Sequence, residues 1–138
     1  MAATPLMTLF TIPKAFSGPA VVMQRNALRS WARLGAGCEV IVLGDDAGTA
    51  EAAREIGARH LAAVARSAAG TPLVSAVFEA AEGAARTEWM CYVNADIILM
   101  SDFPAAAAQM GRFGRFLMGS RRWNLELATP LEFGAGWE

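Results

Sequence analysis

The sequence contains few of the residues that nucleophilic and metal-dependent enzymes use. It has one histidine, His60, and two cysteines, Cys38 and Cys91. A single histidine gives little basis for a Ser-His-Asp or Cys-His catalytic arrangement, and the two cysteines are not spaced like metal ligands. We therefore interpret His60 as a surface or packed imidazole. Both cysteines are interpreted as reduced thiols, which are typical of a cytoplasmic protein.

An excess of charge of one sign and long hydrophobic runs are absent as well. The 12 basic and 13 acidic residues nearly cancel, and the lack of a basic stripe argues against a nucleic-acid partner. No apolar run approaches the roughly 18 residues that cross a bilayer. The first residues also lack the charged-then-apolar order of a signal peptide. We expect a cytoplasmic protein with no transmembrane segment.

Glycine-rich phosphate loops are the third missing feature. The chain has no G-x-x-x-x-G-K-[ST] segment, and G-x-G-x-x-G does not follow the first expected strand. These absences disfavour a P-loop NTPase and a dinucleotide-dependent dehydrogenase.

The chain is rich in apolar residues, which make up 54% of its 138 residues and suffice for one packed core. Apolar, β-prone runs alternate with helical patterns, so we expect a single α/β domain over residues 1–138 with a mostly parallel sheet flanked by helices. Residues 124–138 show no clear period. The expected strands lie at residues 6–12, 39–44 and 59–61, from residue 89 onward, and at 116–120; the expected helices cover 19–34, 49–57, 73–85 and 103–113.

The stretch from Trp89 to Asp102 carries the main candidate site of the chain. Its first apolar run predicts a central strand buried on both faces, and Asn94 and Asp96 follow that run. A second apolar run starts at Ile97, so the Asp96 carboxylate lies between two buried segments and needs a partner, for which a divalent cation is one candidate. The alternative is an ordinary Asn/Asp turn that leaves a strand.

Polar residues follow three of the expected strands. Lys14 comes after the first, Asp45 and Asp46 after the second, and Asn94 and Asp96 after the central one. Because the carboxyl ends of parallel strands share one edge of a sheet, these side chains are expected at the same edge. Carboxylates with a cation there suit a nucleotide that carries a diphosphate and a magnesium or manganese ion.

Two of the expected helices have assignable faces. One face of the helix at residues 73–85 is expected to point inward; its residues are Val74, Val77, Phe78 and Ala81. A polar face of the helix at residues 19–34 is expected to be solvated, with its arginine at position 25 near the predicted ligand-binding edge; its residues are Gln24, Arg25, Asn26 and Arg29.

The segments Gly70-Thr71-Pro72 and Tyr92-Val93-Asn94-Ala95-Asp96, with a helix between them and Asp102 downstream, resemble the central part of a GT-A glycosyltransferase of the family 2 kind. In that family the D-x-D motif ends a strand. An ordered set of further segments is similar to uncharacterised glycosyltransferase-like proteins of plants and bacteria. These segments are Ile12-Pro13-Lys14, Gln24-Arg25-Asn26-Ala27, Ser30-Trp31, Val42-Leu43-Gly44-Asp45, Asn94-Ala95-Asp96-Ile97-Ile98-Leu99 and Arg121-Arg122-Trp123.

The resemblance implies a GT-A (Rossmann-like) fold, incomplete at its C-terminal side, that binds a UDP- or GDP-linked nucleotide-diphospho-sugar with Mn²⁺ or Mg²⁺. Asp96 and Asn94 would hold the metal. The residues implied for nucleotide-sugar binding are Pro13, Lys14, Arg25, Asp45, Thr71, Asn94 and Asp96.

Two departures from the family pattern bear on activity. Asn94 replaces the first aspartate of the motif, and an amide is a weaker metal ligand than a carboxylate. The acceptor-binding half and the catalytic base, which should follow Asp96, are not evident, since Glu126, Glu132 and Glu138 are the only late carboxylates. Sugar transfer therefore stays an open expectation.

There are two alternatives to a glycosyltransferase. One is a non-catalytic, truncated domain that acts as a binding or interaction module and completes its sheet in a homo-oligomer. The other is a sugar-nucleotide pyrophosphorylase, which needs a glycine-rich basic loop after the first strand. The segment Thr11-Ile12-Pro13-Lys14 does not supply that loop.

Overall fold

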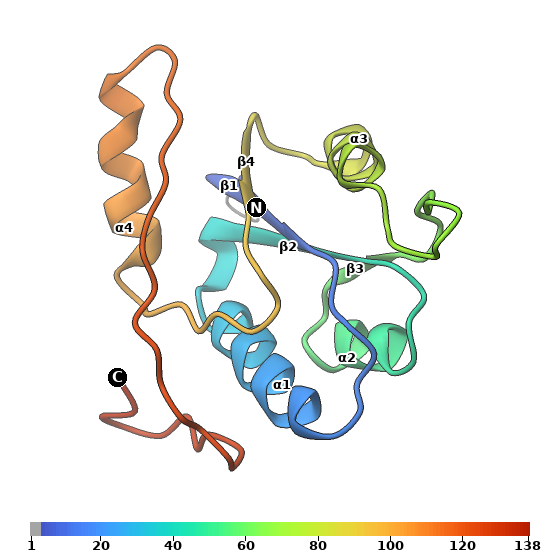
Figure 1. Ribbon diagram of the computed structural model, residues 1–138. Coiled ribbons are helices and arrows are strands. Elements are labelled where there is room, and N and C mark those ends of the chain that lie inside the picture. Colours follow the sequence, from blue (N-terminus) through green and yellow to red (C-terminus); the bar gives the residue numbers. More distant parts are fainter. Residues whose placement is uncertain (1–3) are drawn as a thin grey trace.

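The structure is a computed structural model that describes residues 4–138. It confirms the expected α/β class: four parallel strands form one sheet, and helices cover both of its faces (Figure 1). Among the described residues, no helix combines the length and apolarity needed to cross a membrane. The elements are β1 (Met7–Thr11), α1 (Pro19–Ala32), the 3-10 turn η1 (Gly35–Gly37), β2 (Cys38–Leu43), α2 (Thr49–Glu55), β3 (Arg59–Leu61), α3 (Val74–Ala84), β4 (Trp89–Tyr92), α4 (Phe103–Ala108) and the 3-10 turn η2 (Gln109–Arg112).

The strand order β3-β2-β1-β4 determines where the chain reverses direction across the sheet. From β1 the chain steps outward to β2 and β3, and α1 and α2 lie on one side of the sheet (Figure 1). It then crosses back through α3, on the opposite side, to place β4 on the other flank of β1. This arrangement is doubly wound, and its switch point lies between β1 and β4.

The inner strands of the sheet are β2 and β1, and all five residues of β1 are buried. The expectation that the strand at Trp89 is central and buried on both faces is wrong, because β4 pairs only with β1 and forms an edge. Its first three residues are half-buried, and Tyr92 is 41% exposed. The large side chains of β4 pack against residues from outside the sheet instead. The Trp89 ring, for example, meets the Phe116 ring edge-on at a centroid distance of 5.0 Å.

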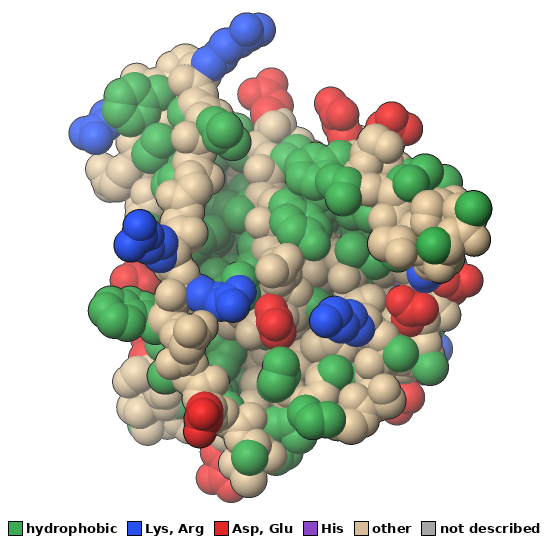
Figure 2. All heavy atoms as spheres, in the orientation of Figure 1, with side chains coloured by type: hydrophobic (Ala, Val, Ile, Leu, Met, Phe, Trp, Pro, Cys, Tyr) green, Lys and Arg blue, Asp and Glu red, His purple; other side chains and the backbone are tan. Residues whose placement is uncertain are grey.

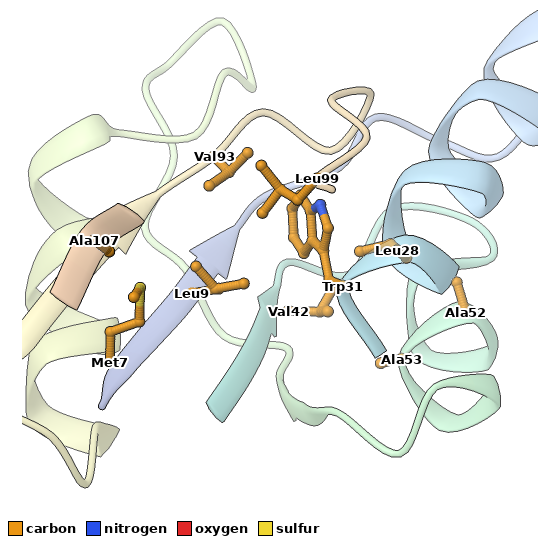
Figure 3. Packing of buried hydrophobic residues seen from close by; sticks show 10 residues of the cluster. All are labelled: Met7, Leu9, Leu28, Trp31, Val42, Ala52, Ala53, Val93, Leu99 and Ala107. Carbon is orange, nitrogen blue, oxygen red and sulfur yellow. The ribbon is translucent and has the colours of Figure 1, made fainter. Parts of the chain in front are cut away.

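The core is divided between the two faces of the sheet. Trp31 and Leu28 of α1 pack on the face that carries Leu9 and Val42, together with Ala52 of α2 (Figure 3). A fully buried leucine contributes about 1.5–3 kcal/mol relative to its exposed state, so these contacts fix α1 firmly against the sheet.

The opposite face of the sheet is covered by α3 and by Val64 of the loop that precedes it. Val77 and Ala81 are buried there against Phe10, as expected. Val74, also expected to point inward, is 72% exposed, whereas Phe78 is 45% exposed but its ring meets the buried Phe10 ring edge-on at a centroid distance of 4.9 Å, as expected. Val74 is the first residue of α3 and lies in the turn before the helix reaches the core.

The prediction of a last strand at residues 116–120 is wrong. The expected helix at 103–113 forms as α4 followed by η2, but residues 113–138 contain no helix or strand. This C-terminal segment passes back beside α4 and then below the sheet (Figure 1). Phe116 contacts the sheet edge through its ring, and no backbone ladder joins residues 116–120 to β4.

Candidate functional site

The switch point between β1 and β4 is where an open α/β sheet binds its ligand. Asn94 and Asp96 follow β4 there, and Lys14 follows β1; all three are exposed. Asp96 forms no ion pair with any residue of the 4–138 range. Burial raises the pKa of the Tyr92 hydroxyl, and the negative charge of Asp96 raises it further. The Asp96 carboxylate is therefore close to Tyr92 and open to solvent.

Asp96 opens onto a groove of about 460 Å³. One wall is formed by residues 96–103, after β4, and the other by residues 120–127 of the C-terminal segment; Met23 and Asn26 of α1 also line the groove. Figure 2 shows both basic and acidic side chains in a band across the middle of this face of the molecule. The groove is lined by Met23, Asn26, Asp96, Ile97, Ile98, Leu99, Met100, Phe103, Ser120, Arg121, Arg122, Trp123, Asn124, Leu125 and Leu127.

Polar side chains of α1 hold both walls of the groove. The Asn26 amide, 1% exposed, donates to the Thr129 carbonyl (3.1 Å) and accepts from the Leu131 N–H (2.8 Å). On the other wall, the Leu99 N–H donates to the Ser30 hydroxyl (3.0 Å), and the Trp31 indole N–H donates to the Ile97 carbonyl (2.8 Å). The helix thus sets the spacing between the walls through buried hydrogen bonds.

Gln24 does the same for the loop after β1. Its side-chain oxygen accepts from the Lys14 N–H (2.8 Å), and its side-chain nitrogen donates to the Lys14 carbonyl (2.9 Å). The expected solvated face is therefore wrong for Gln24 and Asn26, which are 4% and 1% exposed. A signal was present in the sequence, because Gln24 precedes Leu28 by four residues and so lies on the apolar stripe of the helix.

Arg25 is engaged elsewhere. Its guanidinium group pairs with Glu55 (2.5 Å) and Glu51 (3.7 Å) of α2, and it does not line the groove. The phosphate contact expected for Arg25 would require these pairs to break. Pro13, by contrast, is buried directly before Lys14 and fixes the backbone there.

Asp45 and Thr71 belong to a second group, at the end of β2. Arg66, which the sequence analysis missed, pairs with Asp45 (3.0 Å) and with Asp46 (3.4 Å) and donates to the Gly70 carbonyl (2.9 Å). The Ser67 N–H also donates to the Thr71 carbonyl (2.8 Å). Arg66 therefore ties the loop that carries Thr71 to the two aspartates. No motif marks Arg66, since it lies in an irregular loop.

The histidine and the cysteines are structural. The His60 ring nitrogen Nε2 shares a hydrogen bond with the Gly44 carbonyl (2.7 Å). Cys38 and Cys91 are free and half-buried. Burial raises the pKa of both thiols, that of Cys38 to about 11, and the nearby Cys91 adds to the shift at Cys38. Neither is a reactive thiolate at neutral pH.

The residues at the switch point fit a metal ion only together with a ligand. Within residues 4–138 no group of three or more His, Cys, Asp or Glu side chains could hold an ion. Asp96 and Asn94 nevertheless offer hard oxygen donors. Magnesium is commonly held by one or two carboxylates plus substrate phosphates and water. This donor set therefore suits an ion that arrives with a diphosphate, and not one held by the protein alone.

Comparison of the chain with protein-family models, with curated proteins and with solved structures finds no match. The sheet topology and the residues around the groove are therefore the basis for a functional proposal.

Proposed function

We propose that this chain is a glycosyltransferase-like domain that binds a nucleotide-diphospho-sugar with a divalent metal ion, Mn²⁺ or Mg²⁺. The observation that carries the proposal is Asp96: an exposed carboxylate with no ion pair among residues 4–138, at the switch point, opening onto a groove. A carboxylate that is exposed and forms no ion pair at this edge of an α/β sheet is available to bind a ligand.

Each residue of the edge has a distinct role in this proposal. Asp96 and Asn94 hold the metal ion, which, when bound, neutralises charge on the diphosphate leaving group. Lys14 extends its ammonium group toward phosphate from a backbone that Gln24 fixes. Asp45 and Thr71, tied together through Arg66, lie farther along the edge and bind the nucleoside.

We propose binding in preference to turnover by this chain alone. Sugar transfer usually uses a base within hydrogen-bond reach of the acceptor hydroxyl. Asp96 is the only carboxylate among the residues that line the groove, and it is assigned to the metal. Of the late carboxylates, Glu138 accepts hydrogen bonds from the Ser101 N–H (2.6 Å) and hydroxyl (2.8 Å).

Calorimetric titration with UDP and GDP tests the proposal. We expect binding with Mn²⁺ and none with EDTA, since carboxylates repel a bare diphosphate. Changes to groups that merely support metal ligands cost about 10–100-fold in metal affinity, so Asp96→Ala should lose at least that much. The control is Glu88→Ala, an exposed carboxylate at the opposite end of β4. Equal binding in EDTA, or unchanged binding by Asp96→Ala, would refute the proposal.

A further inference from the structure

We infer that Arg121 and Arg122 form a diphosphate-binding wall opposite Asp96, so that the C-terminal segment supplies part of the site. The inference deepens the proposed function and rests on it for the identity of the nucleotide. It starts from the groove itself, because both arginines line it together with Asp96.

The two arginines are not used by the fold. Most other arginines of the chain pair with carboxylates, as Arg59 does with Glu39 and Arg66 with Asp45. Arg121 and Arg122 are exposed and form no ion pair within residues 4–138. The only hydrogen bond between described side chains here runs from the Arg122 Nε to the Asn124 side-chain oxygen (3.2 Å), which leaves the terminal nitrogens of the guanidinium group available.

The charge of the groove selects an anion. Two guanidinium groups and one carboxylate give the lining a net charge of about +1, because no other lining residue is ionisable. Adjacent like charges repel unless a polyanion lies between them. The planar fork of arginine matches phosphate oxygens in two parallel hydrogen bonds. A groove of about 460 Å³ is within the usual range of ligand sites and holds a diphosphate with its metal.

The wall is held at both ends. Upstream, the Phe116 ring packs edge-on against Trp89, with the ring centroids 5.0 Å apart. Downstream, the buried Asn26 amide binds the backbone at Thr129 and Leu131. These contacts position residues 120–123 over the groove although the segment has no secondary structure. The arginines and Asp96 therefore line one groove from different segments of the chain, so that the arginines would bind the diphosphate and Asp96 would hold its metal ion.

Inorganic pyrophosphate is the probe that separates this inference from the proposed function, because it carries no nucleoside or sugar. The double variant Arg121→Ala/Arg122→Ala is compared with Arg115→Ala, an exposed arginine of the same segment that does not line the groove. Titrations of the full chain are run with Mg²⁺, and then repeated with UDP, GDP and uridine. Because the replaced side chains are exposed, the melting temperature should not change.

We expect the double variant to bind pyrophosphate and UDP or GDP at least about tenfold more weakly, since a hydrogen bond to a charged group is worth roughly one to two powers of ten. Arg115→Ala should bind like the wild type, and uridine should not distinguish the variants. Raised salt should reduce the difference. Wild-type protein that does not bind pyrophosphate, or equal pyrophosphate affinity in the wild type and the double variant, would overturn the inference.

The two failures look different. Nucleotide binding that needs Asp96 but not the arginines would remove this inference and keep the proposed function. Arginine-dependent binding of pyrophosphate without binding of UDP or GDP would remove the proposed function and keep the anion-binding wall.

Discussion

A carboxylate lies at each end of the parallel strands, and the two have opposite environments. We call the amino ends of the strands the amino edge of the sheet and the carboxyl ends the carboxyl edge. At the amino edge, Glu39 is 9% exposed in its side chain. It accepts hydrogen bonds from the Thr8 hydroxyl (2.8 Å), the Arg59 guanidinium group (2.8 Å) and the Arg86 N–H (2.9 Å). At the carboxyl edge, Asp96 is exposed and has no ion pair among the described residues.

The difference separates a structural carboxylate from one that can bind a ligand. Burial acts to raise the pKa of Glu39, and the hydrogen bonds from Arg59, Arg86 and Thr8 outweigh it, so that the net shift is downward. Glu39 links β2 to Thr8 of β1, to Arg59 of β3 and to the loop before β4, and these three hydrogen bonds use most of its acceptor capacity. Asp96 supports no such contact, and its lone pairs stay available at the edge where α/β sheets bind ligands.

The largest effect is expected from Glu39→Ala. Removing one partner of a buried ion pair costs about 3–5 kcal/mol; because Arg59 is partly exposed, we expect about 3 kcal/mol less free energy of unfolding. Urea denaturation measures it, and Asp96→Ala under the same conditions should change stability by less than about 0.5 kcal/mol. Similar losses in the two variants would remove the distinction between the edges.

The pH dependence sharpens the same contrast. The pKa of Glu39 is lowered from 4.5 in the folded state, so its contribution is complete above the unfolded pKa and is lost as the pH falls through the folded pKa. Glu39→Gln should therefore lose less stability than the wild type between about pH 6 and about pH 3. Denaturation curves collected across this range check the slope. Parallel profiles for the two proteins would mean that other carboxylates govern acid unfolding.

A smaller loss of stability is expected from changes in α1, whose side chains bind both walls of the groove. Asn26→Ala removes the side-chain partner of the Thr129 carbonyl and of the Leu131 N–H. The free energy of unfolding should fall by about 2 kcal/mol, and this part of the C-terminal segment should be released from α1. Amide hydrogen exchange at Leu131 should accelerate. Gln24→Ala is the matched control, since it frees Lys14 instead; acceleration at Leu131 in both variants would argue against separate anchoring.

The smallest effects are expected at Asp45 and Asp46. Both are exposed or half-exposed partners of Arg66, so either alanine variant should change stability by less than about 1 kcal/mol. Asp45→Ala should nevertheless weaken nucleotide binding more than Asp46→Ala, because Asp45 is the first acidic residue after β2 and its side chain is 70% exposed, against 36% for Asp46. Calorimetry with UDP and Mn²⁺ compares them, and the reverse order would exchange the two roles.

The regular part of the fold could be predicted from periodicity. The alternation of β-prone runs and amphipathic helices indicated β1 to β4 and α1 to α3, and parallel strands followed from that order. The rank of the strands within the sheet could not be read in the same way. Both Leu9 and Cys91 belong to apolar runs, and the edge position of β4 depends on pairing with β1 alone.

The walls of the groove were the least predictable part. Phe116 to Ser120 has the composition of a strand, but strand formation requires a backbone partner, and a composition does not supply one. Gln24 and Asn26 were misjudged because polarity usually means exposure. A carboxamide can also be buried where it meets one N–H and one carbonyl, as both do here. The positions of Asp96 and Lys14 were predictable because the ends of parallel strands share an edge.

The central claim is that the carboxyl edge, and not the amino edge, binds a metal-nucleotide. Paramagnetic broadening of backbone amide signals by Mn²⁺ with UDP or GDP tests it most directly, because the effect falls off steeply with distance from the ion. We expect broadening to concentrate at Asn94, Asp96 and Arg121, while Glu39 and Arg86 keep sharp signals, and we expect Asp96→Ala to abolish the pattern. Broadening centred on Glu39, or none at Asp96 when the nucleotide is bound, would contradict it.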